Sequence, residues 1–265
     1  MEYKKFIFDI GANEGFDGLG LALKNSNYYV HAFEPNPELL KKIILLKKKI
    51  ELRIGKKIEN YQVHSFAVSN KNETRNFNIS RNDRVSSLLK LSENIDEAWP
   101  GYRNNHFRVV KSISVKVITL EKFIIDNKIN SIDYLHIDTQ GNDLRVLQGI
   151  GSKIKLLGMG VMEAAINEEK SAYKDNHTLT EVKNFLKKNN LKIQNINYIE
   201  HKSDLNILKN EVNITFYNPN KIIKLKTKYN VRYFQRVLND RTSIKDELKD
   251  ALIKIINKSK HFIYK

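Results

Sequence analysis

Four carboxylate side chains stand at the ends of short apolar runs in the sequence, namely Asp9, Glu34, Asp138 and Glu163. In an open α/β sheet the parallel strands end at one edge, and ligands bind in the crevice outside that edge. We therefore expect these four carboxylates to surround one crevice. A carboxylate in such a place can accept hydrogen bonds from ligand hydroxyls or remove a proton as a general base.

The turn after the first apolar run has the sequence DIGANEG, starting at Asp9. Glycines let the backbone approach a ligand closely, and the N–H groups at a helix start favour a negative group. A nicotinamide fingerprint would need glycines where Asn13 and Phe16 stand, and a phosphate loop would need a lysine after Gly18. Both patterns fail. Because Glu34 ends the next apolar run, where a carboxylate can bind ribose hydroxyls, the turn indicates an adenosine-containing cofactor.

Apolar runs that alternate with helical patterns predict an α/β fold, with a mostly parallel sheet covered by helices on both faces. The predicted strands are 5–10, 28–33, 61–68, 132–137, 156–162, 191–198 and 212–217. Two more predicted strands, 72–79 and 113–120, flank a polar segment, residues 80–111, that is long for a loop in a compact domain. This segment is a candidate lid or acceptor loop. Its Trp99, Tyr102 and Phe107 could stack on a sugar ring or simply pack the loop.

The composition limits the possible classes of protein. The chain has no cysteine, which excludes disulfides, thiolate zinc sites and a cysteine nucleophile. Neither a signal-peptide core nor a long apolar span is visible, so we expect a soluble, cytoplasmic protein. The net charge is +16, and residues 221–265 carry +9 of it. Because this charge lies far along the chain from the motifs, it argues against a nucleic-acid partner.

The last part of the chain, 221–265, is predicted to be a basic helical extension of a domain that spans 1–220. Within it, Ile244, Leu248, Leu252, Ile255 and Ile256 share one helical face. That face could pack on the domain, pair with a second copy in a homodimer, or lie on a membrane surface.

Five stretches in this order, FIFDIGANEG, HAFEPNP, VHSFAVSN, ITLEKFI and YLHIDTQGNDLRVLQG, resemble the FkbM family of S-adenosylmethionine-dependent methyltransferases. The resemblance covers residues 6–218. It implies a Rossmann-like class I methyltransferase fold with a seven-stranded sheet. It also implies S-adenosyl-L-methionine as cofactor, S-adenosyl-L-homocysteine as product, and O-methylation of a hydroxyl on a sugar, glycan or small natural product.

The resemblance further implies which residues bind the cofactor: Asp9, Gly11, Ala12, Asn13, Gly15, Glu34, Pro35, Phe66, Ala67 and Asp138. The glycine turn would line the methionine part, Glu34 the ribose, Phe66 and Ala67 the adenine, and Asp138 the sulfonium. The sequence departs from a common form of the last motif, with His136 where a lysine is frequent and Gln140 where a glutamate is frequent. These departures are compatible with cofactor binding, but the second one argues against a catalytic role for position 140.

The candidate general bases are Asp138, Glu163 and His136. Asp138 comes first because of its place at a strand end, although it could instead orient the cofactor or cap the following helix. His136 could equally be a hydrogen-bonded core histidine. We expect no metal, since the spacing of Glu163, Asn167 and Glu168 matches no recognised site. The alternatives to a small-molecule or carbohydrate methyltransferase are an RNA methyltransferase and a non-catalytic cofactor-binding scaffold.

Overall fold

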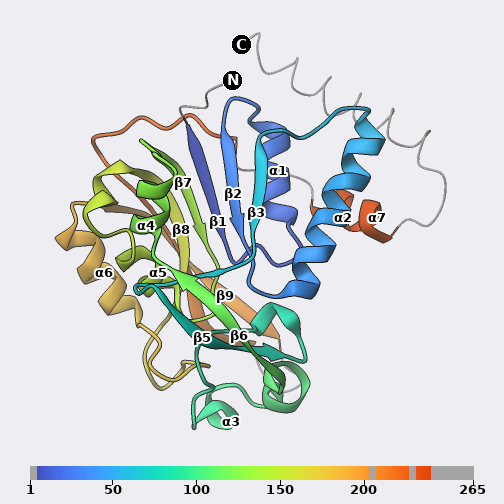
Figure 1. Ribbon diagram of the computed structural model, residues 1–265. Helices are drawn as coiled ribbons and strands as arrows, with labels where there is room; N and C mark the ends of the chain where they lie inside the picture. Colours follow the sequence, from blue (N-terminus) through green and yellow to red (C-terminus); the bar gives the residue numbers. More distant parts are fainter. Residues whose placement is uncertain (1–4, 203–206, 227–230, 240–265) are drawn as a thin grey trace.

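The computed structural model describes residues 5–202, 207–226 and 231–239. These residues form a domain built around a seven-stranded sheet (Figure 1). Its strand order is β3-β2-β1-β7-β8-β10-β9. The bounds are β1 (Phe6–Ile10), β2 (Tyr29–Phe33), β3 (Tyr61–His64), β7 (Ile132–Ile137), β8 (Leu157–Ala165), β9 (Lys192–Lys202) and β10 (Ile207–Tyr217). Neighbouring strands are parallel from β3 to β8, whereas β10 runs antiparallel to both β8 and β9. The prediction of a mostly parallel seven-stranded sheet is confirmed.

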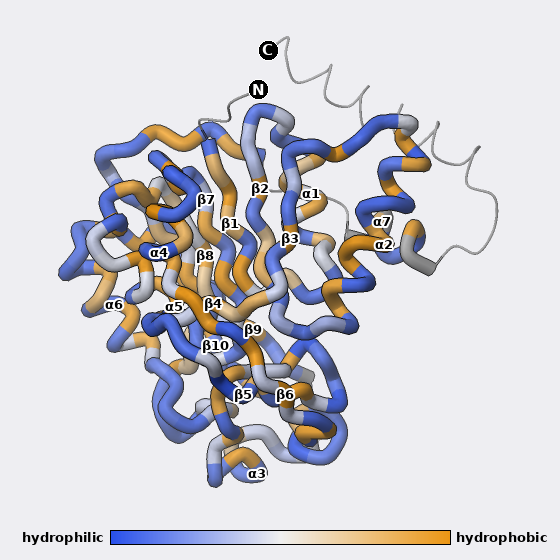
Figure 2. The backbone as a smooth tube through the Cα atoms, viewed as in Figure 1, coloured by the Kyte–Doolittle hydropathy of each residue, from blue (hydrophilic) through white to orange (hydrophobic). Residues whose placement is uncertain are grey.

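Helices cover both faces of this sheet (Figure 1). On one side lie α1 (Phe16–Lys24), α2 (Pro37–Ile54) and α7 (Val231–Asn239), and on the other α4 (Leu120–Asp126), α5 (Asp143–Gln148) and α6 (Leu179–Lys188). Because side chains alternate along a strand, β1 sends Ile7 into the core under α1 and α2, and Phe8 and Ile10 into the core under α4 and α5. Figure 2 shows hydrophobic residues concentrated in the central strands.

A second, three-stranded sheet lies at one end of the first (Figure 1). It consists of β4 (Ala67–Val68), β6 (Val109–Ile118) and β5 (Glu73–Ser80), in that order. The segment between β5 and β6 contains a 3-10 turn (Asp83–Val85), α3 (Ile95–Ala98) and a π-helical turn (Arg103–Phe107). One prediction needs correction here: 61–68 is not a single strand. The chain leaves the large sheet after His64 because Ala67 and Val68 pair with β6 instead.

Local sequence signals fix the helix ends that matter for the site. The Asn36 side chain accepts a hydrogen bond from the Glu38 N–H and so caps α2, which ends at Gly55 with a φ of 64°. The predicted strand 113–120 ends at Ile118, because the Thr119 hydroxyl accepts from the Lys122 N–H and starts α4. The predicted strand 156–162 is longer in the structure, where β8 ends at Ala165, so Glu163 lies within the strand.

Helix α7 packs through Phe234 and Val237 against the core formed by α1 and α2. The amphipathic helix predicted around Ile244 to Ile256 lies outside the described residues. Of the helices that the structure does describe, none is both long enough and apolar enough to span a bilayer.

Candidate active site

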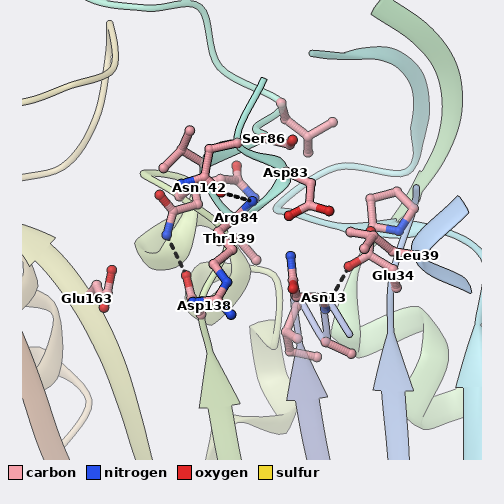
Figure 3. Close-up of a pocket in the computed structure, with 18 of the residues that line it drawn as sticks. Asn13, Glu34, Leu39, Asp83, Arg84, Ser86, Asp138, Thr139, Asn142 and Glu163 are labelled. Atoms are coloured by element: carbon pink, nitrogen blue, oxygen red, sulfur yellow. Dashed lines mark hydrogen bonds between the residues drawn. The ribbon is translucent and has the colours of Figure 1, made fainter. Parts of the chain in front are cut away.

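A cavity of about 500 Å³ lies at the carboxyl ends of the parallel strands. The β1–α1 turn, the end of β2, the β7–α5 turn and β8 form one side, and residues of the 80–111 segment form the other. Figure 3 shows this arrangement, with Asp83, Arg84 and Ser86 across the cavity from Asn13 and Glu34, and with Asp138 and Glu163 on neighbouring strands. The cavity therefore joins the region around Glu34 to the region around Glu163.

The turn at Gly11 lies against the turn that follows β7. Gly11 has a φ of +85°, and a Cβ there would come within 1.8 Å of the Asp138 carbonyl oxygen. Both the Gly11 and Ala12 N–H groups donate to the Phe33 carbonyl oxygen at 3.0 Å. Only glycine fits this position. The backbone of Gly11 therefore forms part of the cavity floor, and a ligand can approach it closely. Gly15 is different, since it begins α1 and packs against Ile43 outside the cavity lining.

Glu34 is 4% exposed and is fixed by two backbone donors. The Asn13 N–H donates to Oε2 and the Asn36 N–H to Oε1, both at 2.8 Å (Figure 3 shows the first). Burial raises the pKa of Glu34 to about 8, against these two hydrogen bonds, which lower it. Each carboxylate oxygen keeps a second lone pair, so two adjacent ligand hydroxyls could bind at the cavity wall, which Pro35 continues.

Asp9 and His136 lie beneath the cavity and are not among its lining residues. Asp9 is fully buried, and His136 Nδ1 lies 2.8 Å from its Oδ1. Burial alone would lower the pKa of His136, but the hydrogen bond and the charge of Asp9 outweigh it and raise the pKa to about 9. The structure thus places one predicted general base, His136, as the partner of a buried carboxylate. Asp9, predicted to line the crevice, supports its floor from below.

The end of the cavity farthest from Glu34 is acidic. Asp138, Glu163 and Glu211 line it, and His201 Nε2 lies 3.2 Å from Glu211 Oε2. Burial raises the pKa of Glu163 well above its usual value, and the charges of Asp138, Glu211 and Asp143 add to this effect. Within the part of the chain that the structure describes, no hydrogen bond reaches the Glu163 carboxylate. This carboxylate is therefore available to a ligand.

Asp138, in contrast, has a partner. Gln140 Nε2 donates to Asp138 Oδ1 at 2.7 Å. The carboxylate does not cap the next helix, because α5 begins after Asn142. Burial raises the pKa of Asp138, while the Gln140 hydrogen bond and the charge of His136 oppose that rise.

The aromatic residues of the 80–111 segment both pack and line the cavity. Trp99 and Phe107 are buried in one cluster with Tyr173, and Trp99 Nε1 donates to the Lys170 carbonyl oxygen at 3.0 Å. Tyr102 packs edge-on against Trp99, with ring centroids 5.6 Å apart. The lining also contains Phe66, which follows β3, and Ala67, the first residue of β4.

A family model described as "Methyltransferase FkbM domain" matches residues 9–200. The chain belongs to the FkbM methyltransferase family. This confirms the resemblance stated from the motifs, and with it S-adenosylmethionine as the cofactor of the family. No curated protein matches the sequence.

Several solved structures resemble the chain in outline. The FkbM methyltransferase from Methylobacillus flagellatus KT is 14% identical, with a TM-score of 0.47 over 81% of this chain and 43% of that one. TehB from Haemophilus influenzae is 15% identical, with a TM-score of 0.44 over 81% and 57%. M. capricolum TrmK, solved with S-adenosyl-homocysteine, is 13% identical, with a TM-score of 0.40 over 83% and 64%. The chain thus spans less than half the length of the M. flagellatus protein.

Sequence reasoning missed the residues that reach the cavity from outside the parallel strands. Glu211 and His201 come from the antiparallel pair β10 and β9, and Asp83 comes from the 80–111 segment. A signal for Glu211 was present, because it directly precedes the predicted strand 212–217. Because β10 is antiparallel to β8, it places Glu211 opposite Ala165, the last residue of β8, at the edge where the parallel strands end.

Proposed function

We propose that the chain is an S-adenosylmethionine-dependent methyltransferase that methylates a hydroxyl of a sugar, glycan or small natural product. The observation that carries this proposal is the single cavity, which extends from the two acceptor oxygens of Glu34 to the carboxylates at its far end. The residues fit the cofactor, since the exposed backbone of the glycine turn and the buried Glu34 carboxylate line the same cavity. S-adenosylmethionine supplies a methyl group on a positively charged sulfur.

Each residue then has a defined task in this proposal. Glu34 accepts hydrogen bonds from the ribose hydroxyls, and Asp138 lies beside the positively charged end of the cofactor. Glu163 takes the proton from the acceptor hydroxyl as that oxygen gains the methyl group. Burial and the neighbouring acids raise its pKa, which makes its ionised form a stronger base. Trp99 and Tyr102 supply apolar walls to the far end, as a sugar ring requires.

The remaining residue calls are also part of the proposal. Gly11, Ala12 and Asn13 would contact the methionine part, and Pro35, Phe66 and Ala67 the adenosine part, all from the cavity lining. Asp9, Gly15 and His136 lie outside that lining and would act by shaping the turn and the sheet edge. Much of the catalytic effect would come from aligning the two reactants and excluding water.

Calorimetric titration with S-adenosylmethionine and S-adenosylhomocysteine tests the donor half of the proposal. We expect both to bind, and we expect Glu34→Ala to weaken both by tenfold or more, since a carboxylate hydrogen-bonded to hydroxyls contributes about 1.5–3 kcal/mol. Absence of binding by the unaltered protein would contradict the proposal.

The acceptor half needs a screen of hydroxylated acceptors in which formation of S-adenosylhomocysteine is measured. Sugars, glycans and small phenolic or aliphatic alcohols should be compared with RNA. Turnover with RNA alone would favour the nucleic-acid alternative. Cofactor binding without turnover on any acceptor would favour a scaffold.

A further inference from the structure

Gln140 connects the cavity floor to two other parts of the molecule. It lies in the turn after β7 with a φ of 55°, a conformation that costs free energy in any residue other than glycine. Its carbonyl oxygen accepts from the Ser87 hydroxyl at 2.7 Å, and its Oε1 lies 3.2 Å from the Tyr173 hydroxyl. The contact from its Nε2 to Asp138 is thus held by residues of the 80–111 segment and of the chain after β8.

The orientation of this side-chain amide has a chemical consequence. An amide nitrogen only donates, so Nε2 at 2.7 Å matches a carboxylate oxygen that only accepts. The Tyr173 hydroxyl has one proton and also lies 2.7 Å from the Val85 carbonyl oxygen, so it donates to one of the two acceptors at a time. When this hydroxyl donates to Gln140 Oε1, it holds the amide in the orientation that presents Nε2 to Asp138.

Asp138 needs such a donor because of its neighbours. The titratable groups that act on it or crowd the same part of the cavity come from six elements: Asp9 of β1, Asp17 of α1, His136 of β7, Asp143 of α5, Glu163 of β8 and Glu211 of β10. Five of them are acids, and acids close together resist ionising at the same time. A neutral donor stabilises the ionised form of Asp138 without adding another negative charge.

We propose that Gln140 is a positioning residue, which holds the Asp138 carboxylate ionised and directed into the cavity. This inference rests on the proposed function, in which that carboxylate lies beside the sulfonium of the cofactor. A glutamate at position 140 could not donate to an ionised Asp138, so the two carboxyls would share a proton.

The test compares the affinities for S-adenosylmethionine and S-adenosylhomocysteine between pH 5.5 and 9.5. The two ligands share the ribose, so protonation of Glu34 cancels in the ratio of their Kd values. They differ in the methyl group and in the charge of the sulfonium, and of these two only the charge makes the ratio depend on the ionisation of nearby acids. We expect the preference for S-adenosylmethionine to rise with pH in the unaltered protein. Gln140→Met has no donor, so the midpoint of this rise should lie about one pH unit higher than in the unaltered protein. At a pH between the two midpoints, the variant should therefore show up to about a tenfold smaller preference for S-adenosylmethionine.

Gln140→Glu gives a second signature. While the introduced carboxyl and that of Asp138 share one proton, their combined charge equals that of Asp138 and Gln140 in the unaltered protein. The preference for S-adenosylmethionine at neutral pH should therefore be unchanged. It should rise further at higher pH, when the shared proton is lost. Gln148→Glu, on the exposed contact to Asn70, is the matched charge control. It should change neither the preference at neutral pH nor its rise with pH.

The inference would be overturned by an unshifted midpoint in Gln140→Met. It would also be overturned if the pH profile of Gln140→Glu were identical to that of the unaltered protein, and this second comparison remains valid even if Gln140→Met does not fold. A merely structural role would weaken both ligands equally and leave the ratio unchanged. If the unaltered protein bound neither ligand, the proposed function itself would fail, a result distinct from an unshifted ratio.

Discussion

His136 and Asp9 are directly opposite each other on neighbouring parallel strands, and their side chains meet with Nδ1 2.8 Å from Oδ1. A carboxylate as deeply buried as Asp9 is costly unless it is paired. Its other oxygen, Oδ2, lies where a Cβ on Gly18 would come within 2.6 Å. The pair therefore stabilises the floor on which the glycine turn rests.

This pairing predicts how stability depends on pH. The folded pKa of His136, about 9, lies above the usual value of 6.5, so its contribution is complete below pH 6.5 and is lost as the pH rises through 9. Urea unfolding of His136→Gln and the unaltered protein should differ by about 2–3 kcal/mol at pH 6.5 and converge near pH 9.5. His177→Gln, which alters a partly exposed pair with Glu181, is the control and should show no such convergence.

Gly11→Ala should be far more harmful than an alanine at another glycine with positive φ. The new methyl group would collide with the Asp138 carbonyl oxygen, so the two turns must separate. We expect a loss of 3 kcal/mol or more in the free energy of unfolding, or loss of cofactor binding, as for strong overpacking. Gly55→Ala meets no atom within 4 Å and should cost only about 1–2 kcal/mol, from its φ of +64° alone. Equal losses in the two variants would argue against the close approach.

Lys42 should slow the release of the cofactor product. Its Nζ lies 3.4 Å from Glu14 Oε1 and 3.7 Å from Asp83 Oδ2, and so connects the β1–α1 turn to the 80–111 segment. Because Lys42 is partly exposed, each ion pair contributes less than about 1 kcal/mol. Stopped-flow measurements should show S-adenosylhomocysteine leaving about two to five times faster from Lys42→Met, a difference that salt reduces. Lys41→Met, which loses only an exposed pair with Glu38, should leave the rate unchanged.

Glu163→Gln should separate catalysis from donor binding. With an acceptor found by the screen, we expect kcat to fall by about 10²- to 10⁴-fold, the usual contribution of a general base. The affinity for S-adenosylmethionine should stay within about twofold, and the remaining rate should lose the rise with pH that ionisation of Glu163 gives. Glu169→Gln, at an exposed position, is the control. An unchanged kcat in Glu163→Gln would exclude Glu163 as the base.

Much of the candidate site could be predicted from local sequence. Glu34, Asp138 and Glu163 end up on one cavity because apolar runs mark the strands and parallel strands end at one edge. The sequence could not show that Asp9 would lie under the cavity and not within it. That outcome depends on which face of β1 its side chain occupies and on His136, which is distant in the chain.

The sequence by itself determined the cofactor class and the order of the elements. These properties depend on short motifs and on hydrophobic periodicity, which act over a few residues. Only the tertiary structure decided that β3 ends at His64, that Glu211 and His201 complete the acidic end of the cavity, and that Gln140 holds Asp138. The physical reason is that strand direction, register and contacts between distant segments are set by the packing of the whole core, and no local pattern encodes them.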